Sequence, residues 1–262
     1  MALNLRFFSA LLISFLMGSV VAEAATCGST AAGFAAWKAA FAPQAKAGGI
    51  GPRGLSALAG TTYSTGTIFA DRHQKSFHLS LSAFMAKRGS TGIVAQAKRL
   101  KAANAALFSS LEQRYGVPPG PILAIWGMET GFGAVTGNQP TISATATLAY
   151  DCRRTAFFQD QLMAALKLVD RGVLSSSTRG AMHGEVGQTQ FMPKNILLFG
   201  VGSNLNAKAD ALASTANYLR GHGWHKGAGY QPGESNFGAI QGWNAARVYE
   251  EAIAIMGKQI DG

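Results

Sequence analysis

One carboxyl group in this sequence lies where it could transfer a proton. Glu129 falls in the segment WGMETGFG (126–133), at the expected end of an apolar helix. Burial against Trp126, Met128 or Phe132 disfavours the charged carboxylate, and the negative end of the helix dipole acts in the same direction. A glutamic acid that keeps its proton near neutral pH is suited to be the general acid for a glycosidic oxygen. The same pattern also fits a Glu in a helix C-terminal turn that points into solvent.

Other kinds of catalytic site are not indicated. The sequence contains no Gly-x-Ser-x-Gly elbow, no P-loop and no Gly-x-Gly-x-x-Gly run that follows a β-strand pattern as a dinucleotide fingerprint does, which argues against nucleophile-elbow hydrolases and nucleotide enzymes. Two cysteines and five dispersed histidines do not make a zinc site, and segment 200–206 has no carboxylate for calcium. We therefore expect no metal and no cofactor. The histidines are His73, His78, His183, His222 and His225.

The N-terminus resembles an export signal. A basic residue at Arg6 precedes the apolar run 7–21, and Ala22-Glu23-Ala24 fits the small-residue cleavage rule. We predict a cleaved signal peptide over 1–24 and no permanent membrane anchor, because the run is short for a membrane span. The alternative is a short N-terminal anchor.

Export makes pairing of the two cysteines plausible. Cys27 and Cys152 are the whole cysteine content, and an oxidising compartment favours a disulfide between them. The alternative is two buried free thiols.

The charge balance favours an anionic partner. The 262 residues carry 23 Lys and Arg against 13 Asp and Glu, a net charge of +10. Export and the absence of a basic run longer than two residues argue against nucleic acid. A periplasmic or cell-surface polyanion is the expected partner.

The apolar residues recur with a helical period along most of the chain. We expect a mainly α fold in one domain over 25–262, with at most a short β element. Residues 58–70 carry the one β signal, and 175–192 is too rich in Gly, Ser and Thr for a regular helix. The apolar positions of the expected helices span 34–41, 77–84, 93–111, 122–126, 158–169, 212–219 and 240–256.

Six segments occur in order along the chain: 71–74, YGVPP (115–119), IWGMETGFG (125–133), 150–158, GQTQFMP (187–193) and ASTANYL (213–219). Together they closely resemble the lytic murein transglycosylases of the B type. The resemblance covers roughly residues 30–257. It implies a lysozyme-like catalytic core with additional helices. It also implies cleavage of the glycan strand between N-acetylmuramic acid and N-acetylglucosamine, with a 1,6-anhydro-muramic acid end as the product.

The resemblance assigns roles to individual residues. Glu129 matches the family's catalytic acid, which then acts as base. Gln190 matches a glutamine that lines the site, and Tyr218 a tyrosine of the saccharide groove. Near the C-terminus the family has a Tyr-Asn pair that reaches the site. Trp243 replaces that tyrosine here, so Asn244 alone carries over.

Further positions, some matched by the resemblance and some departing from it, bear on substrate binding and chemistry. Arg153 and Arg154 match a pair near the peptide stem and could attract its carboxylates, although an exposed Arg pair is as often a solvated face. The family often has a serine at the position of Ala181, which puts assistance to the acid from that position in doubt. Glu185 is an extra carboxylate in the same loop, where a Glu is usually solvated. If it faced Glu129, a two-carboxylate hydrolysis would become possible.

Three functions therefore remain open. The first is a periplasmic murein transglycosylase that acts on peptidoglycan glycan strands. The second is a hydrolytic muramidase on the same scaffold, and the third is a non-catalytic murein-binding protein. The sequence does not identify a protein partner in cell-wall assembly.

Overall fold

The structure is a computed structural model that describes residues 25–73 and 79–262. The expected signal peptide and His78 lie outside the described residues. Over the described ranges the fold is mainly α with one two-stranded β-sheet, as the sequence predicts. The helices are η1 (Ala31–Gly33, 3-10), α1 (Phe34–Ala47), α2 (Pro52–Ala59), α3 (Thr65–Arg72), α4 (Leu81–Arg88), α5 (Ser90–Ala103), α6 (Ala105–Tyr115), α7 (Pro119–Thr130), α8 (Thr141–Tyr150), α9 (Thr155–Asp170), α10 (Pro193–Phe199), α11 (Lys208–Gly221), α12 (Phe237–Trp243) and α13 (Arg247–Asp261).

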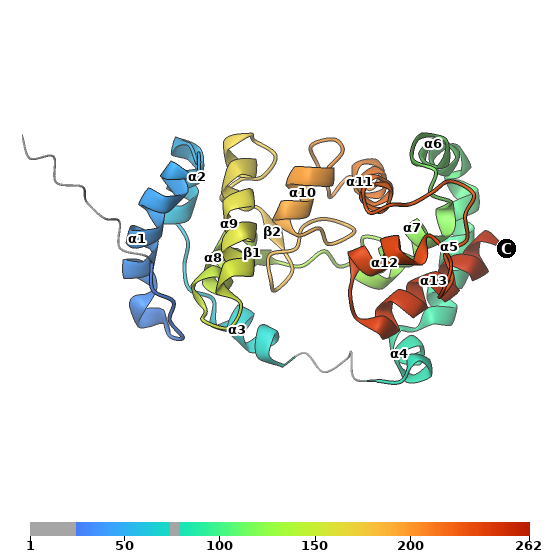
Figure 1. The fold of residues 1–262 in the computed structure, drawn as a ribbon, viewed down its shortest axis with the longest axis horizontal. Coiled ribbons are helices and arrows are strands. Elements are labelled where there is room, and N and C mark those ends of the chain that lie inside the picture. Colours follow the sequence, from blue (N-terminus) through green and yellow to red (C-terminus); the bar gives the residue numbers. More distant parts are fainter. Residues whose placement is uncertain (1–24, 74–78) are drawn as a thin grey trace, which may run out of the picture.

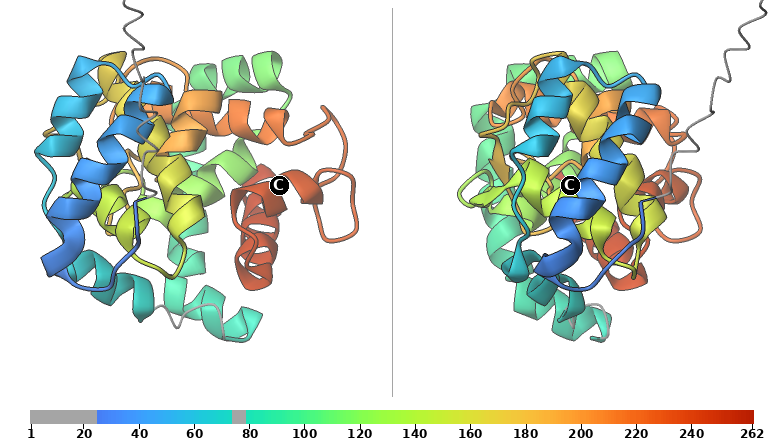
Figure 2. Two further views of the ribbon diagram at one scale, coloured as in Figure 1. Left: turned by 60° about the vertical axis from the view of Figure 1, so that its left-hand side comes forward. Right: turned by 90° about the vertical axis from the view of Figure 1, so that its left-hand side faces the viewer.

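The helices form two groups towards opposite ends of the molecule (Figures 1 and 2). Each group encloses one hydrophobic cluster. The N-terminal core joins α1, α2, α8 and α9 and contains Trp37 and Phe158. The C-terminal core joins α4 to α7 with α11, α12 and α13 and contains Phe84 and Tyr249. Trp243 packs against both cores, so the end of α12 lies at their junction. Among the described residues, no helix is long and apolar enough to cross a membrane.

The β element lies elsewhere than predicted. Strand β1 (Gln139–Pro140) pairs antiparallel with β2 (Arg179–Gly180), and β2 lies within the stretch 175–192 expected to be irregular. The prediction of β structure over 58–70 is wrong, because α2 and α3 occupy most of it.

Side chains stabilise the helical conformation around 58–70. The Ser64 hydroxyl accepts a hydrogen bond from Thr67 N at 3.2 Å and caps α3. The backbone N–H groups of Thr62 and Ser64 donate to the Ser143 and Thr147 hydroxyls of α8. These tertiary contacts override the β preference of the threonines.

Two expected long helices are each broken at an asparagine. Asn104 separates α5 from α6, and its Nδ2 donates to Leu100 O at 2.9 Å. Asn244 ends α12, and its Oδ1 accepts from Ala246 N at 3.0 Å before α13 begins. Asparagine side chains compete with the helix for backbone partners, which explains both interruptions.

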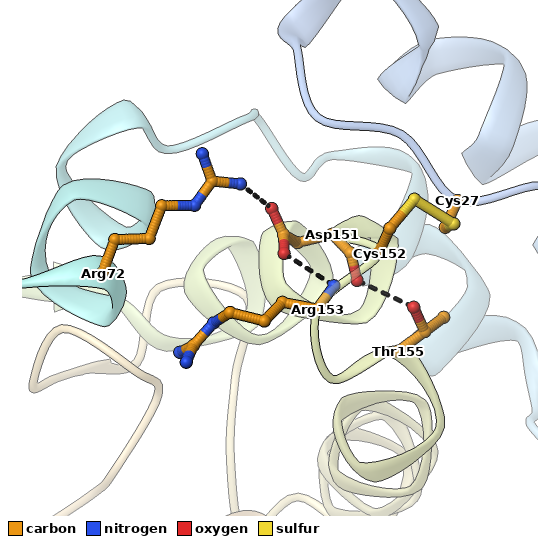
Figure 3. The surroundings of a disulfide bond; sticks show 6 residues. All are labelled: Cys27, Arg72, Asp151, Cys152, Arg153 and Thr155. Carbon is orange, nitrogen blue, oxygen red and sulfur yellow. Dashed lines mark hydrogen bonds and ion pairs between the residues drawn. A yellow bond between two sulfur atoms is a disulfide. The ribbon is translucent and has the colours of Figure 1, made fainter.

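A disulfide between Cys27 and Cys152 ties the start of the described chain to the turn between α8 and α9 (Figure 3). Gly28 N donates to Tyr150 O at 3.0 Å beside it. The buried Asp151 carboxylate accepts from Arg72 of α3 at 2.6 Å. The N-terminal segment, α3 and α9 are therefore held together at one point.

The first prediction concerns this disulfide. Serine at both Cys27 and Cys152 should lower the free energy of unfolding by up to about 5 kcal/mol, because the bond closes a loop of about 125 residues in the unfolded chain. Denaturant unfolding of the oxidised protein and the double variant measures the difference. The intact mass of exported protein should rise by two hydrogens on reduction. Two thiols that alkylate in the native protein would contradict the prediction.

Candidate active site

Helix α7 presents one carboxyl group to a cavity. Pro119 is the first residue of α7, a position whose backbone N–H has no partner within the helix, so proline loses no hydrogen bond there. Within α7 every residue except Glu129 is buried. Gly131 ends the helix in the left-handed region, at φ 58°. The Thr130 hydroxyl then donates to Gln188 O at 2.5 Å and accepts from Gly133 N at 2.9 Å. These bonds fix the end of α7 against the loop 181–192.

The cavity has a volume of about 200 Å³ and lies between the two hydrophobic cores. Residues from α7, from the loop 181–192 and from α10, α11 and α12 contribute to its wall. The site is therefore assembled from segments far apart in the sequence. Its lining residues are Glu129, Glu185, Gln190, Phe191, Met192, Asn195, Tyr218, Trp243 and Asn244.

Two hydrogen bonds orient the Glu129 carboxyl group. Tyr249 Oη donates to Oε1 at 2.6 Å, and Trp243 Nε1 donates to the same oxygen at 3.0 Å. Because Oε1 accepts both bonds, the proton of the neutral acid is best accommodated on Oε2. A carboxyl group with one engaged oxygen and one proton-bearing oxygen is arranged as a hydrogen donor.

The surroundings of Glu129 favour its protonated form. Burial raises the pKa of Glu129 above its ordinary value, and the nearby negative charge of Glu185 acts in the same direction. The hydrogen bonds from Tyr249 and Trp243 and the positive charge of Arg88 oppose this shift without reversing it. The result is the raised carboxyl pKa that the apolar flanks of Glu129 predict.

Gln190 faces the cavity from a strained backbone position. Its φ of 55° lies in the left-handed region, which a residue with a side chain seldom adopts. Its Nε2 donates to Gly187 O at 2.8 Å and to Thr136 O at 3.1 Å. Both hydrogens of the amide are thus engaged by the protein, and Oε1 is the group that Gln190 can offer a ligand. It would accept a hydrogen bond from a substrate N–H or O–H.

Tyr218 and Asn244 both line the cavity. The Tyr218 hydroxyl donates to Gly242 O, and burial raises its pKa to about 12. Because that hydroxyl is engaged, Tyr218 offers its ring to the cavity wall. Asn244 uses Oδ1 to accept from Ala246 N at 3.0 Å, so its amide hydrogens are the groups available to a ligand.

The Glu185 side chain lines the cavity and is not a solvated loop side chain. Its side chain is 23% exposed. His183 N donates to Oε2 at 3.0 Å, and His183 Nδ1 lies 3.3 Å from Oε1. Burial alone would raise the pKa of Glu185. The hydrogen bonds and charge of His183 have the larger combined effect, so the pKa of Glu185 lies below its ordinary value. The expectation of a solvated side chain fails because the turn at 181–185 closes back on itself, with Ala181 N donating to Glu185 O.

Arg153 and Arg154 bind a carboxylate of the protein. Both guanidinium groups form ion pairs with Asp71, and Arg153 Nε donates to Asp71 Oδ2 at 2.7 Å. Burial pushes the pKa of Asp71 upward, but the two arginines outweigh it and lower the pKa. Neither arginine belongs to the described residues that line the cavity. The structure therefore gives them a partner within the chain.

The sequence analysis missed two donors of the site. The apolar period places Trp243 in the stripe of the last expected helix and assigns no role to Tyr249, yet both donate to Glu129. The available signal was chemical, because buried tryptophan and tyrosine need partners for their N–H and O–H groups. The break at Asn244, which the stripe did not reveal, brings both to one carboxyl group.

Comparisons with known proteins agree with this geometry. The family model described as the transglycosylase SLT domain matches residues 33–232. Membrane-bound lytic murein transglycosylase B of Escherichia coli (strain K12) is 37% identical over an alignment of 123 residues, which covers 44% of this chain and 34% of that protein. The match thus spans about a third of the relative's length.

Solved structures extend the likeness to most of the chain. SltB3 from Pseudomonas aeruginosa, in complex with NAG-anhNAM-pentapeptide, superposes with a TM-score of 0.79 at 28% identity, over 87% of this chain and 80% of that one. Escherichia coli Slt35 in complex with calcium superposes with a TM-score of 0.72 at 21% identity, over 85% and 92% of the two chains. The expectation of a lytic transglycosylase fold is confirmed.

The second prediction tests the hydrogen bond from Tyr249. The variant Tyr249→Phe removes a donor that favours the Glu129 carboxylate, so the pKa of Glu129 should rise further. Carbon-13 NMR of labelled glutamate carboxyl groups, followed over pH, measures this directly. Tyr115→Phe is the matched control, because the Tyr115 hydroxyl is buried without a hydrogen-bond partner among the described residues. An unchanged or lower Glu129 pKa in Tyr249→Phe would refute the assignment.

Proposed function

The chain belongs to the transglycosylase SLT domain family, and from this we propose that it is a lytic transglycosylase of peptidoglycan. It cleaves the glycan strand between N-acetylmuramic acid and N-acetylglucosamine and leaves 1,6-anhydro-muramic acid ends. The observation that carries the proposal is the Glu129 carboxyl group, with a raised pKa, in a cavity between two cores. One such group can serve both proton transfers of this reaction.

The reaction proceeds in two half-steps. Protonated Glu129 gives its hydrogen to the glycosidic oxygen, and the bond from that oxygen to the anomeric carbon of the muramic acid breaks. The 6-hydroxyl of the same sugar then attacks the anomeric carbon, and the Glu129 carboxylate takes the hydroxyl proton. Glu129 is thereby restored, and water is not consumed. In this proposal Gln190 Oε1 and the Asn244 amide hydrogens bind amide and hydroxyl groups of the sugar, which is supported by the presence of both residues in the cavity wall.

The relatives and the charge support the choice of substrate. SltB3 has been solved with NAG-anhNAM-pentapeptide and with NAG-NAM-pentapeptide. The net charge of +10 suits a polymer with stem-peptide carboxylates, an attraction that salt screens. The Cys27–Cys152 disulfide and the expected signal peptide over 1–24 support a periplasmic location. The chain therefore meets its substrate outside the cytoplasm, without nucleic acid as a partner.

A hydrolytic muramidase is the second candidate, because Glu185 shares the cavity with Glu129. A second carboxylate could activate water or form a covalent intermediate. The products separate the two functions. Mass spectrometry of soluble fragments from purified sacculi should find muramic acid ends that are one water lighter than reducing ends. Reducing ends would establish the muramidase, and binding without cleavage would establish a non-catalytic murein-binding protein.

The third prediction concerns Glu129 itself. Glu129→Gln keeps the size of the side chain but can neither donate nor recover the proton, so turnover should fall by about 10²-fold to 10⁴-fold or more. Binding to sacculi, measured by sedimentation, should be retained. Because wild-type Glu129 must be protonated to act first, turnover should also decline as the pH rises through its raised pKa. Full activity in the variant would exclude Glu129 as the acid.

The fourth prediction is that turnover needs no metal ion. The carboxyl group, the sugar hydroxyl and the acetamido group together supply the proton and charge movements of the reaction. Dialysis against a chelator should leave the rate of sacculus digestion unchanged. Loss of activity that zinc or calcium restores would count against the proposed mechanism.

A further inference from the structure

We propose that Glu185 acts as a fixed anion in the reaction, stabilising the positive charge that develops on the sugar ring when the glycosidic bond breaks. This role rests on the proposed function. The glycosidic transition state has oxocarbenium character, with positive charge at the anomeric carbon and ring oxygen. A negative charge built into the cavity stabilises that state more than the neutral substrate.

The geometry places Glu185 in the same cavity as Glu129 but on a different element. Glu129 enters from the end of α7, and Glu185 enters from the loop between β2 and α10. The two carboxyl groups are close enough for the charge of Glu185 to raise the pKa of Glu129. A sugar bound in the cavity would therefore meet an acid from one element and an anion from another.

The contacts of Glu185 keep it in place and ionised. Its Oε2 accepts from His183 N at 3.0 Å, and its Oε1 lies 3.3 Å from His183 Nδ1. The other ring nitrogen, His183 Nε2, lies 3.8 Å from Asp71 Oδ1, and Asp71 is held by Arg153 and Arg154. The mostly buried imidazole thus links the anion in the cavity, through Asp71, to Arg153 and Arg154.

The same contacts argue against Glu185 as nucleophile or base. Both of its oxygens are engaged by His183, so neither is free to form a bond with the anomeric carbon without losing a partner. A general base works best with a pKa near the working pH, and the pKa of Glu185 is lowered. A carboxylate held in this way is suited to stabilise charge and poorly suited to take a proton from water.

The anion also affects the acid that faces it. The charged groups around Glu129 are Glu185 in the loop and Arg88 of α4, and the hydroxyl of Tyr249 donates from α13. Of the two charges, Glu185 disfavours ionisation of Glu129 and Arg88 favours it. Neutralising Glu185 should therefore lower the pKa of Glu129.

The test compares Glu185→Gln, which keeps the shape without the charge, with Glu185→Asp, which keeps the charge. Glu112→Gln is the matched control, because it removes one negative charge from an exposed position on α6. In Glu185→Gln we expect kcat on sacculi to fall on the order of 10²-fold to 10³-fold. KM should change little, and the products should still carry anhydro ends. Glu185→Asp should retain more activity than Glu185→Gln, and Glu112→Gln should match the wild type.

A second readout needs no turnover. Carbon-13 NMR titration of the Glu129 carboxyl should give a lower pKa in Glu185→Gln than in the wild type, and the high-pH limb of the kcat profile should move to lower pH. Wild-type kcat in Glu185→Gln, or an unshifted Glu129 titration in a variant with native thermal unfolding, would overturn the proposal. Reducing ends among the wild-type products would instead overturn the proposed function. The NMR comparison does not depend on that function, so the two failures can be distinguished.

Discussion

Glu129 has to be withdrawn from water far enough to keep its proton and yet remain open to a polymer, and this conflict governs the architecture around it. Helix α7 meets the first demand because all its other residues are buried, so that buried protein flanks Glu129 and raises its pKa. The second demand is met at the junction of the two cores, where packing leaves a cavity of about 200 Å³ at the end of that helix. A carboxyl group inside a single closed core would be as well desolvated, but no glycan strand could reach it.

The loop 181–192 connects the site to both halves of the molecule. Val186 and Phe191 exchange backbone hydrogen bonds of 2.9 Å, which closes the loop, and Gln188 Oε1 accepts from Trp126 Nε1 of α7 at 3.0 Å. Gly187 takes a φ of 81°, and a Cβ there would lie 2.5 Å from Leu205 O, so only glycine suits the position. The loop therefore sets the distance between the acid on α7 and the groups that it carries itself, Glu185 and Gln190.

The local environment of Glu129 could be predicted from the sequence because it depends on neighbours in the chain, whereas its partners could not. Apolar residues beside Glu129 and prolines before the helix indicate burial and a helix start without any tertiary information. Trp243 and Tyr249 reach Glu129 only because the chain breaks at Asn244, and a hydrophobic stripe does not reveal such a break. The sequence does not predict helix α8 for a related reason. All ten of its residues are buried, so no alternation of polar and apolar faces produces a helical period in its hydrophobicity. Glu185 was read as a solvated loop residue because its contacts with His183 depend on the fold of the whole loop.

The two half-steps of the proposed reaction make demands on Glu129 that agree with each other. The first needs a carboxyl group that holds its proton until the glycosidic oxygen is in place, and the second needs a carboxylate basic enough to take a proton from a sugar hydroxyl. A raised pKa serves both, because a weaker acid has the stronger conjugate base. Burial and Glu185 supply that shift, while Tyr249 and Trp243 keep the intermediate carboxylate from becoming too unstable to form. Burial and Glu129 raise the pKa of Tyr249 well above its ordinary value, so Tyr249 remains a donor through both half-steps and cannot take the proton that the sugar must receive.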